Sequence, residues 1–321
     1  MILGYRLKNV FKMKCVVNSK YKEFEEYVRQ LPFSFDTEGE VIYDERNVLK
    51  RIRVKDMDWV VKRFKKPNVI NRIVYSFFRK SKALRSFVYS EEILRRGFVT
   101  PEPVAALEEY TFGLLGYSYY ICAHEAGETV RALMRGEVSG NESELRAFAE
   151  YTASLHQKGV IHLDYSPGNI LISRVNGGYS FSLIDVNRMK FVDGEVDRET
   201  AAFNLRRLCI SRDVLGYVAT CYAAFRGWAD ASWVKKCEEM SDRFFAGLMY
   251  KIAFRNPVGR ASARTVFRFK LYRSLRRMLP SASSAARRLF AKESELYNHY
   301  FAASDLRAVY KELYARPGSA Q

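Results

Sequence analysis

The stretch His162–Asn169 has the sequence His-Leu-Asp-Tyr-Ser-Pro-Gly-Asn, which follows the pattern H-x-D-x-x-x-x-N. A run with helical spacing ends at Gly159 just before it, and an apolar run, Ile170–Ser173, follows it. The motif is therefore expected in a tight loop between a helix and a strand. Such a loop would hold two oxygen-bearing side chains, Asp164 and Asn169, close together.

These two side chains predict a particular chemistry. Phosphoryl transfer to a hydroxyl needs a carboxylate that orients the nucleophile and accepts its proton, and Asp164 can serve. It also needs oxygen ligands for magnesium. Asn169 offers one, and Asp185, sixteen residues further on at the end of the apolar run Phe181–Ile184, offers another.

A lysine upstream supplies the third expected group. Residues Val60–Phe64 alternate as in a strand, so that Lys62 shares a face with apolar neighbours. An inward lysine needs an anion, and the phosphates of ATP would serve. Taken singly, Lys62 could be a solvated edge residue and Asp185 the start of a turn. The order of Lys62, the H-x-D motif and Asp185 in one chain is what favours the functional interpretation.

The local patterns predict an α+β chain. Antiparallel strands are expected first, then a basic helical stretch that ends at Gly97, then more strands and helices. Asn141 and Glu144 resemble a capping box at the start of a helix, and Asn176-Gly177-Gly178 predicts a hairpin. The expected strands are 40–43, 48–54, 59–64, 104–109, 118–122, 160–163, 170–173 and 181–184, and the expected helices are 71–96 and 141–159.

Two histidines near the motif are expected to have structural roles. His162 should buttress the loop backbone instead of transferring protons. His156 lies in the last turn of a predicted helix, where a positive charge would suit the helix dipole. Neither is expected to bind a metal.

Composition points to a polyanionic partner. The 321 residues include 53 Lys and Arg against 36 Asp and Glu, and Arg243 to Lys292 holds 13 Lys and Arg with no acid. The five cysteines form no C-x-x-C pair, so neither a disulfide framework nor a zinc knuckle is expected, and a reducing cytoplasm fits. The sequence predicts neither a signal peptide nor a transmembrane helix.

Between about Gly39 and Arg226, the chain resembles the lipopolysaccharide core kinases of the Kdo/WaaP type, which have a protein-kinase-like fold. The resemblance is carried by VVKRFKKPN around Lys62, and by RKSKALRSF, GFVTPEPVA, HLDYSPGNIL and LIDVNRMKF further along the chain. It implies a two-lobed α+β fold, with a small antiparallel-sheet N-lobe and a mainly helical C-lobe. It also implies ATP and magnesium as cofactors and an inner-core sugar, Kdo or heptose, as the acceptor.

The resemblance assigns roles to the residues already singled out. Lys62 would contact the nucleotide phosphates, Asp164 would act as base, and Asn169 and Asp185 would bind magnesium. ATP would lie between the lobes, with a hinge near Ile121–Glu125. Asp-Val-Asn stands where protein kinases have Asp-Phe-Gly, and no Ala-Pro-Glu follows, so a peptide-gripping activation loop is not expected.

Two departures from the family pattern concern nucleotide binding. No G-x-G-x-x-G loop is present, so the phosphates would be covered by the backbone near Asp44–Asn47. A glutamate that pairs with Lys62 is expected near Val88, and Glu91 or Glu92, about one turn on, could substitute. If neither reaches Lys62, a degraded kinase becomes an alternative.

Three regions are expected: an N-lobe (1–124), a C-lobe (125–255) and a basic, helical extension (256–321). Within the extension, Ala261–Leu279 forms a basic amphipathic pattern that fits either an anionic membrane surface or packing on the C-lobe. A cytoplasmic enzyme, peripheral on the inner membrane of a Gram-negative-type cell, would meet a lipid-linked sugar acceptor there. The alternatives are a membrane-associated pseudokinase and a kinase that acts on protein or another small molecule; nucleic acid is the least favoured partner.

Overall fold

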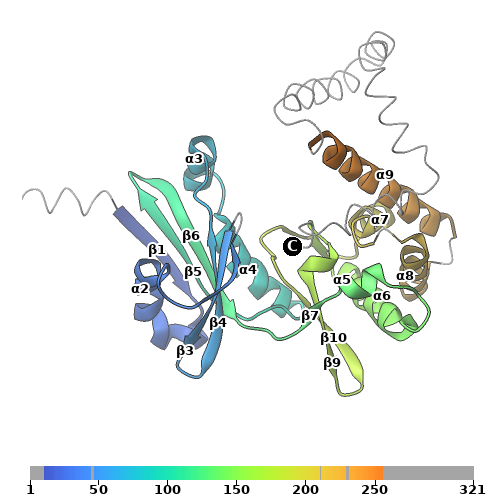
Figure 1. Cartoon of the computed structure of the whole chain (residues 1–321), viewed down its shortest axis with the longest axis horizontal. Helices are drawn as coiled ribbons and strands as arrows, with labels where there is room; N and C mark the ends of the chain where they lie inside the picture. The colour runs from blue at the N-terminus through green and yellow to red at the C-terminus, as the bar shows by residue number, and fades with distance from the viewer. Residues whose placement is uncertain (1–10, 45–46, 210, 229–230, 256–321) are drawn as a thin grey trace, which may run out of the picture.

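The computed structural model describes residues 11–44, 47–209, 211–228 and 231–255. A sheet-rich lobe formed by the first part of the chain stands beside a mainly helical lobe formed by the second (Figure 1). This confirms the predicted α+β class. The expected boundaries at residues 124 and 255 stay predictions, and the expected extension 256–321 lies outside the described residues.

The N-lobe is built on a six-stranded sheet in which all neighbouring strands are antiparallel. The five strands predicted here are confirmed within a few residues, and the edge strand β1 was not predicted. In β1 the exposed Lys12 and Lys14 alternate with Phe11, Met13 and Cys15, and exposed lysines are common on the edge strand of a sheet. In sheet order the strands are β1 (Phe11–Val17), β5 (Pro103–Thr111), β6 (Leu114–Ala123), β4 (Met57–Phe64), β3 (Asn47–Val54) and β2 (Glu40–Asp44).

Alternation along β4 distributes its side chains between two layers. Trp59 and Val61 are buried on the face covered by η1 (Ser19–Phe24) and α2 (Glu25–Ser34). Phe64 is buried on the opposite face, against α4 (Lys82–Arg95). Lys62 lies on β4 between these apolar positions, and only 13% of its side chain is exposed.

The single helix predicted over 71–96 is wrong: two helices occupy this stretch. They are α3 (Val69–Phe77) and α4, and the chain leaves the helical conformation at Phe78. Ser81 then starts α4 because its side chain accepts a hydrogen bond from Leu84 N at 3.1 Å. The predicted end at Gly97 is confirmed, since this glycine has a φ of +85°.

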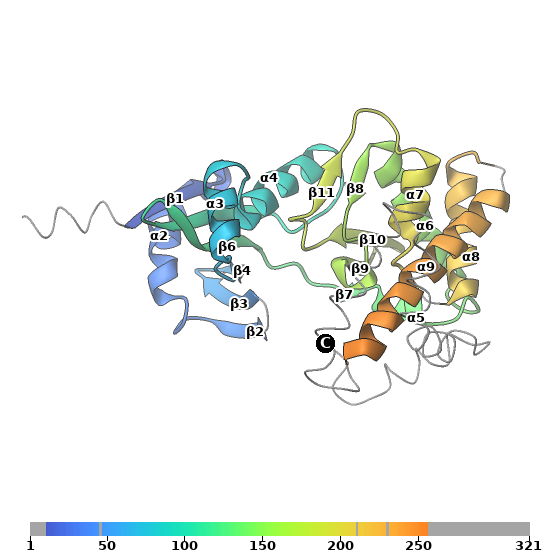
Figure 2. The same cartoon turned by 90° about the horizontal axis from the view of Figure 1, so that it is seen from above.

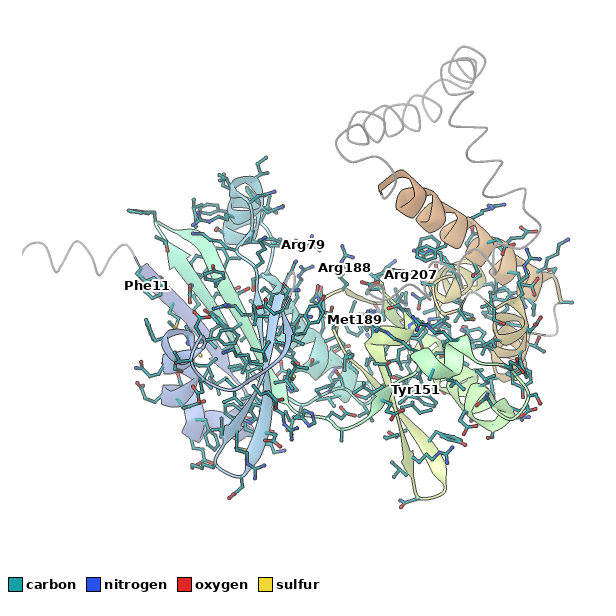
Figure 3. All side chains as sticks on the ribbon, viewed as in Figure 1. Phe11, Arg79, Tyr151, Arg188, Met189 and Arg207 are labelled. Carbon is teal, nitrogen blue, oxygen red and sulfur yellow. The ribbon has the colours of Figure 1, made fainter. Side chains whose placement is uncertain are left out.

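Among the described residues, the C-lobe packs five helices around one apolar core. Short ladders lie between this core and the N-lobe: β7 (Glu128–Thr129) with β9 (Ile170–Val175) and β10 (Gly178–Leu183), and β8 (Val160–His162) with β11 (Met189–Phe191) (Figure 2). Met189 belongs to the core and Tyr151 packs against it (Figure 3). The helices are α5 (Arg131–Arg135), α6 (Glu142–Gln157), α7 (Arg198–Leu205), α8 (Arg212–Phe225) and α9 (Ala231–Arg255).

Turn chemistry explains how α6 is connected. The helix ends before Gly159, as predicted, and a Cβ at this glycine would lie 2.2 Å from the carbonyl oxygen of Val192. The predicted capping box is wrong, because the Asn141 amide donates to the carbonyl of Glu137 (3.0 Å) and makes no cap. The predicted hairpin between β9 and β10 is confirmed.

Within the ranges described above, no helix has the length and apolar character needed to cross a membrane.

Candidate functional site

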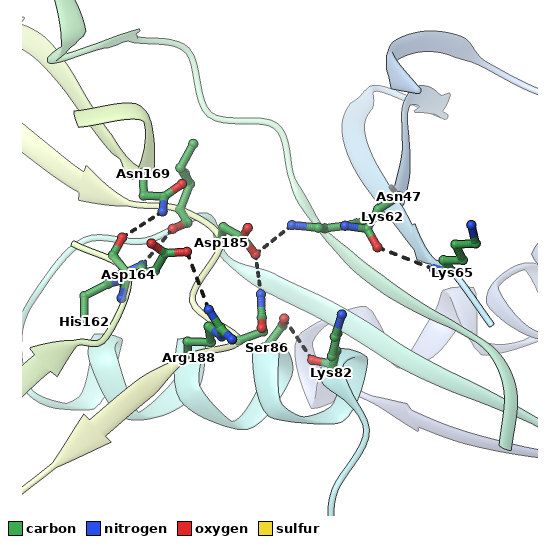
Figure 4. Close-up of polar contacts among 12 residues, drawn as sticks. Asn47, Lys62, Lys65, Lys82, Ser86, His162, Asp164, Asn169, Asp185 and Arg188 are labelled. Carbon is green, nitrogen blue, oxygen red and sulfur yellow. Dashed lines mark hydrogen bonds and ion pairs between the residues drawn. The ribbon is translucent and has the colours of Figure 1, made fainter. Parts of the chain in front are cut away.

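An ion pair between the two lobes forms the centre of the site (Figure 4). Lys62 Nζ, from β4, lies 2.7 Å from Asp185 Oδ1, which follows β10. Asn187 donates to the same carboxylate oxygen. Burial by itself would raise the pKa of Asp185, but the charge and hydrogen bond of Lys62 bring it below its ordinary value. Asp185 is therefore held as an anion between the lobes.

Asp185 has an unusual backbone conformation. Its φ of +53° lies in the left-handed region, which costs a residue with a Cβ about 1–2 kcal/mol. Both backbone polar groups of the preceding residue are hydrogen-bonded. Ile184 N donates to Asn169 O (2.9 Å), and Ile184 O accepts from His162 Nε2 (3.1 Å). Strain that the surrounding hydrogen bonds maintain is typical of functional positions.

The H-x-D loop brings Asp164 and Asn169 together as predicted. Asn169 lies in the short turn η2 (Pro167–Asn169), and its side-chain Nδ2 donates to Asp164 O (2.9 Å). The Asp164 backbone N–H donates to His162 Nδ1 (3.1 Å). The loop is thus closed by its own polar groups, and Figure 4 shows Asp164, Asn169 and Asp185 near one another.

His162 has the structural role that was expected. Its Nδ1 accepts a hydrogen bond, so the proton lies on Nε2 and is donated to Ile184 O. Burial lowers the pKa of His162, which fits a neutral imidazole. The side chain therefore holds the H-x-D loop against the residue that precedes Asp185.

A buried polar network supports this loop from α6, α7 and α8. His156 Nδ1 bonds to the Tyr222 hydroxyl (2.8 Å) and its Nε2 to Asn204 Oδ1 (3.0 Å), while Asn204 Nδ2 donates to His162 O (2.9 Å). Arg226 donates to the Tyr222 hydroxyl (2.6 Å). Burial lowers the pKa of His156 to about 4, so the positive helix-end charge expected for this residue is wrong.

Two arginines beside Asp164 were not predicted. Arg207 forms an ion pair with Asp164 Oδ1, and a guanidinium nitrogen of Arg188 lies 4.0 Å from Oδ2. Arg207 Nε is buried without a hydrogen-bond partner in the part of the chain that the structure describes. Sequence reasoning had no signal for these residues, because arginine is common throughout this chain.

The first turn of α4 faces the Lys62–Asp185 pair. Lys82 and Ser86 lie on this side of the helix (Figure 4), and the ammonium groups of Lys62 and Lys82 are 5.3 and 5.9 Å from the centre of the Phe64 ring. Burial lowers the pKa of Lys82, and the positive charge of Lys62 lowers it further, whereas the negative charge of Asp185 raises it. The helix therefore contributes positive charge to the site.

The structure does not bring Glu91 or Glu92 to Lys62, and this corrects the expected pair. Glu92 lies about 9 Å along the helix axis from Ser86, and it pairs with Arg95 (2.7 Å) and Arg96 (2.6 Å). The hydrogen bond from Arg95 is the main cause that lowers the pKa of Glu92, to about 2. Glu91 is exposed on the surface of α4.

The oxygen atoms that remain are suited to a hard cation. Lys62 and Asn187 both bond to Oδ1 of Asp185, which leaves Oδ2, and the Asn169 nitrogen is engaged, which leaves its amide oxygen. Carboxylate and amide oxygens are the ligands that magnesium prefers, and Lys62 is the matching cation for a phosphate. The described residues contain no group of three His, Cys, Asp or Glu side chains that by itself could hold a metal ion. The backbone expected to cover the phosphates, Asp44–Asn47, lies partly outside the described residues.

Comparison with known proteins gives a result at the level of the fold. No family model and no curated protein matches the chain. Among solved structures, it is similar to WaaP in complex with acyl carrier protein, with 14% identity, 72% of this chain and 98% of that chain covered, and a TM-score of 0.50.

Two further solved structures are less similar. One is the Rio2 kinase–ADP/Mg2+-phosphoaspartate complex from Chaetomium thermophilum, with 13% identity, 67% of this chain and 74% of that chain covered, and a TM-score of 0.38. The other is the PknI kinase domain of Mycobacterium tuberculosis, with 14% identity, 64% of this chain and 92% of that chain covered, and a TM-score of 0.34. The likeness to WaaP shows that this chain has a kinase-like fold.

Proposed function

We propose that this protein is an ATP- and magnesium-dependent phosphotransferase that acts on a hydroxyl of a lipopolysaccharide inner-core sugar, Kdo or heptose. The observation that carries the proposal is the meeting of Lys62 with Asp185 between the lobes, beside Asp164 and Asn169. The kinase-like fold and the sequence resemblance support it. Bound ATP and magnesium would supply the phosphoryl group and neutralise its charge.

In this proposal each side chain has one task. Lys62 contacts nucleotide phosphate, and Asn169 and Asp185 offer oxygens to magnesium. Asp164 orients the acceptor hydroxyl and receives its proton. Arg207, paired with Asp164 Oδ1, holds that carboxylate in one orientation, and the hydroxyl would approach its other oxygen, Oδ2.

The charge around Asp164 bears on the acceptor. Arg188 and Arg207 are both within ion-pair distance of this carboxylate, and Arg207 Nε has no partner among the described residues. Guanidinium groups bind carboxylates and phosphates with matched geometry. The arrangement supports a negatively charged acceptor, and Kdo, which carries a carboxylate, fits it better than an unmodified heptose.

Transfer of labelled γ-phosphate from ATP to Kdo-lipid A and to heptose-bearing core tests the proposal. Asp164→Ala should abolish transfer and leave the far-ultraviolet spectrum unchanged, whereas Asp193→Ala, at an exposed aspartate, is the matched control and should remain active. Asp185→Ala should remove magnesium-dependent ATP binding. Transfer that persists in Asp164→Ala would count against the assigned base.

A membrane-associated pseudokinase is a second candidate, favoured by one observation. The turn of α4 that faces Lys62 presents Lys82 and Ser86 instead of an acid, and Lys62 pairs with Asp185. Without a glutamate to position it, Lys62 could bind nucleotide without supporting transfer. Magnesium-ATP binding with no transfer to any acceptor, including protein and small molecules, would favour this candidate.

A further inference from the structure

The helix α3 turns polar side chains toward the sheet and apolar side chains toward solvent. Its contacts with β6 are made by polar groups: Arg72 Nε donates to Leu115 O (2.8 Å), and Leu115 N donates to Ser76 Oγ (2.9 Å). None of its side chains is buried. Val74 and Tyr75 are half-buried, but most of its large apolar residues face solvent, with Ile70 75%, Phe77 68% and the following Phe78 82% exposed. A surface helix normally turns such residues inward.

This apolar ridge lies within a strongly basic stretch. Residues 59–90 contain nine Lys and Arg and no Asp or Glu. Lys65 and Lys66 precede α3, and Arg79 and Lys80 follow it, and all four are exposed. An exposed apolar ridge between two pairs of cations matches a surface that is apolar inside and negatively charged outside.

We infer that α3 and its flanking lysines and arginines, residues 65–80, form a docking surface for an anionic lipid bilayer. The aromatic and aliphatic side chains would enter the interface, and the cations would lie at the headgroups. This names a surface for the anionic membrane expected from the sequence, and it rests on the proposed function, whose acceptor is linked to lipid. Vesicle binding needs no nucleotide, so its failure and the failure of phosphoryl transfer are distinguishable.

Charge argues against two other occupants. A second copy of the chain would bring two basic stretches together across a symmetric interface. The chain's own residues 256–321 contain 13 Lys and Arg against four Asp and Glu, so they would be repelled as well. An anionic bilayer is the occupant whose charge complements residues 65–80.

The position of α3 relative to the site agrees with this inference. Arg79, just after α3, and Arg188 both act electrostatically on Arg85, so both lie near the same part of α4. Figure 3 labels Arg79, Arg188 and Arg207 along one side of the junction between the lobes. Docking through α3 would therefore place the cations beside Asp164 on the membrane side, where a lipid-linked acceptor is presented.

A tryptophan placed on the ridge tests the inference in the full-length protein. Phe77→Trp puts an indole at an exposed position, whereas the native Trp59 and Trp233 are buried and Trp228 is half-buried, so the emission of the variant is compared with that of the wild type. Phe33→Trp is the matched control, because Phe33 lies on α2 and is 72% exposed. With vesicles of phosphatidylcholine and phosphatidylglycerol that contain doxyl-labelled lipid, the emission of Phe77→Trp should shift to the blue and be quenched. The emission of Phe33→Trp should not change.

Binding constants give the second measurement. Ile70→Ser combined with Phe77→Ser should weaken binding to the anionic vesicles by about tenfold or more, because two exposed apolar side chains are lost and no buried contact is. Phe33→Ser should bind like the wild type. Vesicle binding without a change in the Phe77→Trp emission would mean that another segment docks and would overturn the inference. Equal binding to pure phosphatidylcholine, or no binding at all, would overturn it too.

Discussion

Protonation of His156 should destabilise the fold. This imidazole is buried and makes two hydrogen bonds, to Tyr222 and Asn204, and its pKa falls from 6.5 to about 4 on folding because burial disfavours the charged form. Between these pH values the unfolded chain holds a proton on His156 and the folded chain does not. Stability should therefore be complete above pH 6.5 and fall as the pH is lowered toward 4.

The expected size follows from linkage. Each pH unit in this window changes the free energy of unfolding by about 1.4 kcal/mol for one proton. Between pH 7 and pH 5, the contribution of His156 should fall by about 2 kcal/mol, because titration of the unfolded chain is incomplete near its own pKa. The pKa of His162 is also lowered by burial, so the wild type should lose more than this single contribution.

Urea unfolding at several pH values, followed by tryptophan fluorescence, measures the effect. Trp233 stacks on Tyr222, with ring centres 5.0 Å apart, so its emission reports on this network. His156→Gln should be less stable at pH 7 and should have a shallower pH dependence by about 2 kcal/mol between pH 7 and 5, with His124→Gln as the control for loss of a histidine elsewhere. An unchanged pH dependence in His156→Gln would refute the reasoning. If this variant does not fold, an imidazole NMR titration of the wild type that gives a pKa near 6.5 would refute it equally.

Three further outcomes are expected. Gly159→Ala should lower the free energy of unfolding by at least about 2 kcal/mol, because a residue in the left-handed region acquires a Cβ against a backbone carbonyl. Gly177→Ala, where φ is +79° and the space around the Cβ is open, should lower it by about 1 kcal/mol; urea unfolding checks both. Tyr222→Phe should cost about 1–3 kcal/mol in the same assay, since it leaves two buried partners unpaired. Lys62→Met should raise the pKa of Asp185, measurable by carboxyl NMR titration; an unchanged value would show that the pair does not form in solution.

The parts of the fold that were predicted are those with local signals. Alternation in Val60–Phe64 gave the strand, its two faces and the inward lysine, and Asn176-Gly177 gave the hairpin. The parts that were missed depend on distant partners or on broken patterns. β1 pairs with β5, far along the chain, and α2 contains Pro32 within its span. The break before Ser81 was missed because no glycine or proline marks it.

The site divides in the same way. Asp164 and Asn169 belong to one short motif, so their closeness is fixed by the loop that contains them. Arg207 and Asn204 come from α7 and the residues after it, some forty residues later, and only the packing of α7 brings them to the H-x-D loop. Contacts of this kind leave no periodic signal in a single sequence, and one arginine among 53 Lys and Arg does not stand out.

The charges in the site have two opposite consequences. Four cations, Lys62, Lys82, Arg188 and Arg207, surround two carboxylates, so the described site carries excess positive charge that a nearby glutamate would have reduced. The excess strengthens attraction for nucleotide phosphates and for an anionic acceptor. Without that glutamate, Asp185 is the one ion-pair partner of Lys62 among the described residues. Asp185 is also the residue expected to bind magnesium, so Lys62 is positioned less firmly. Tight nucleotide binding is therefore expected of an active enzyme and of a pseudokinase alike, and only phosphoryl transfer separates them.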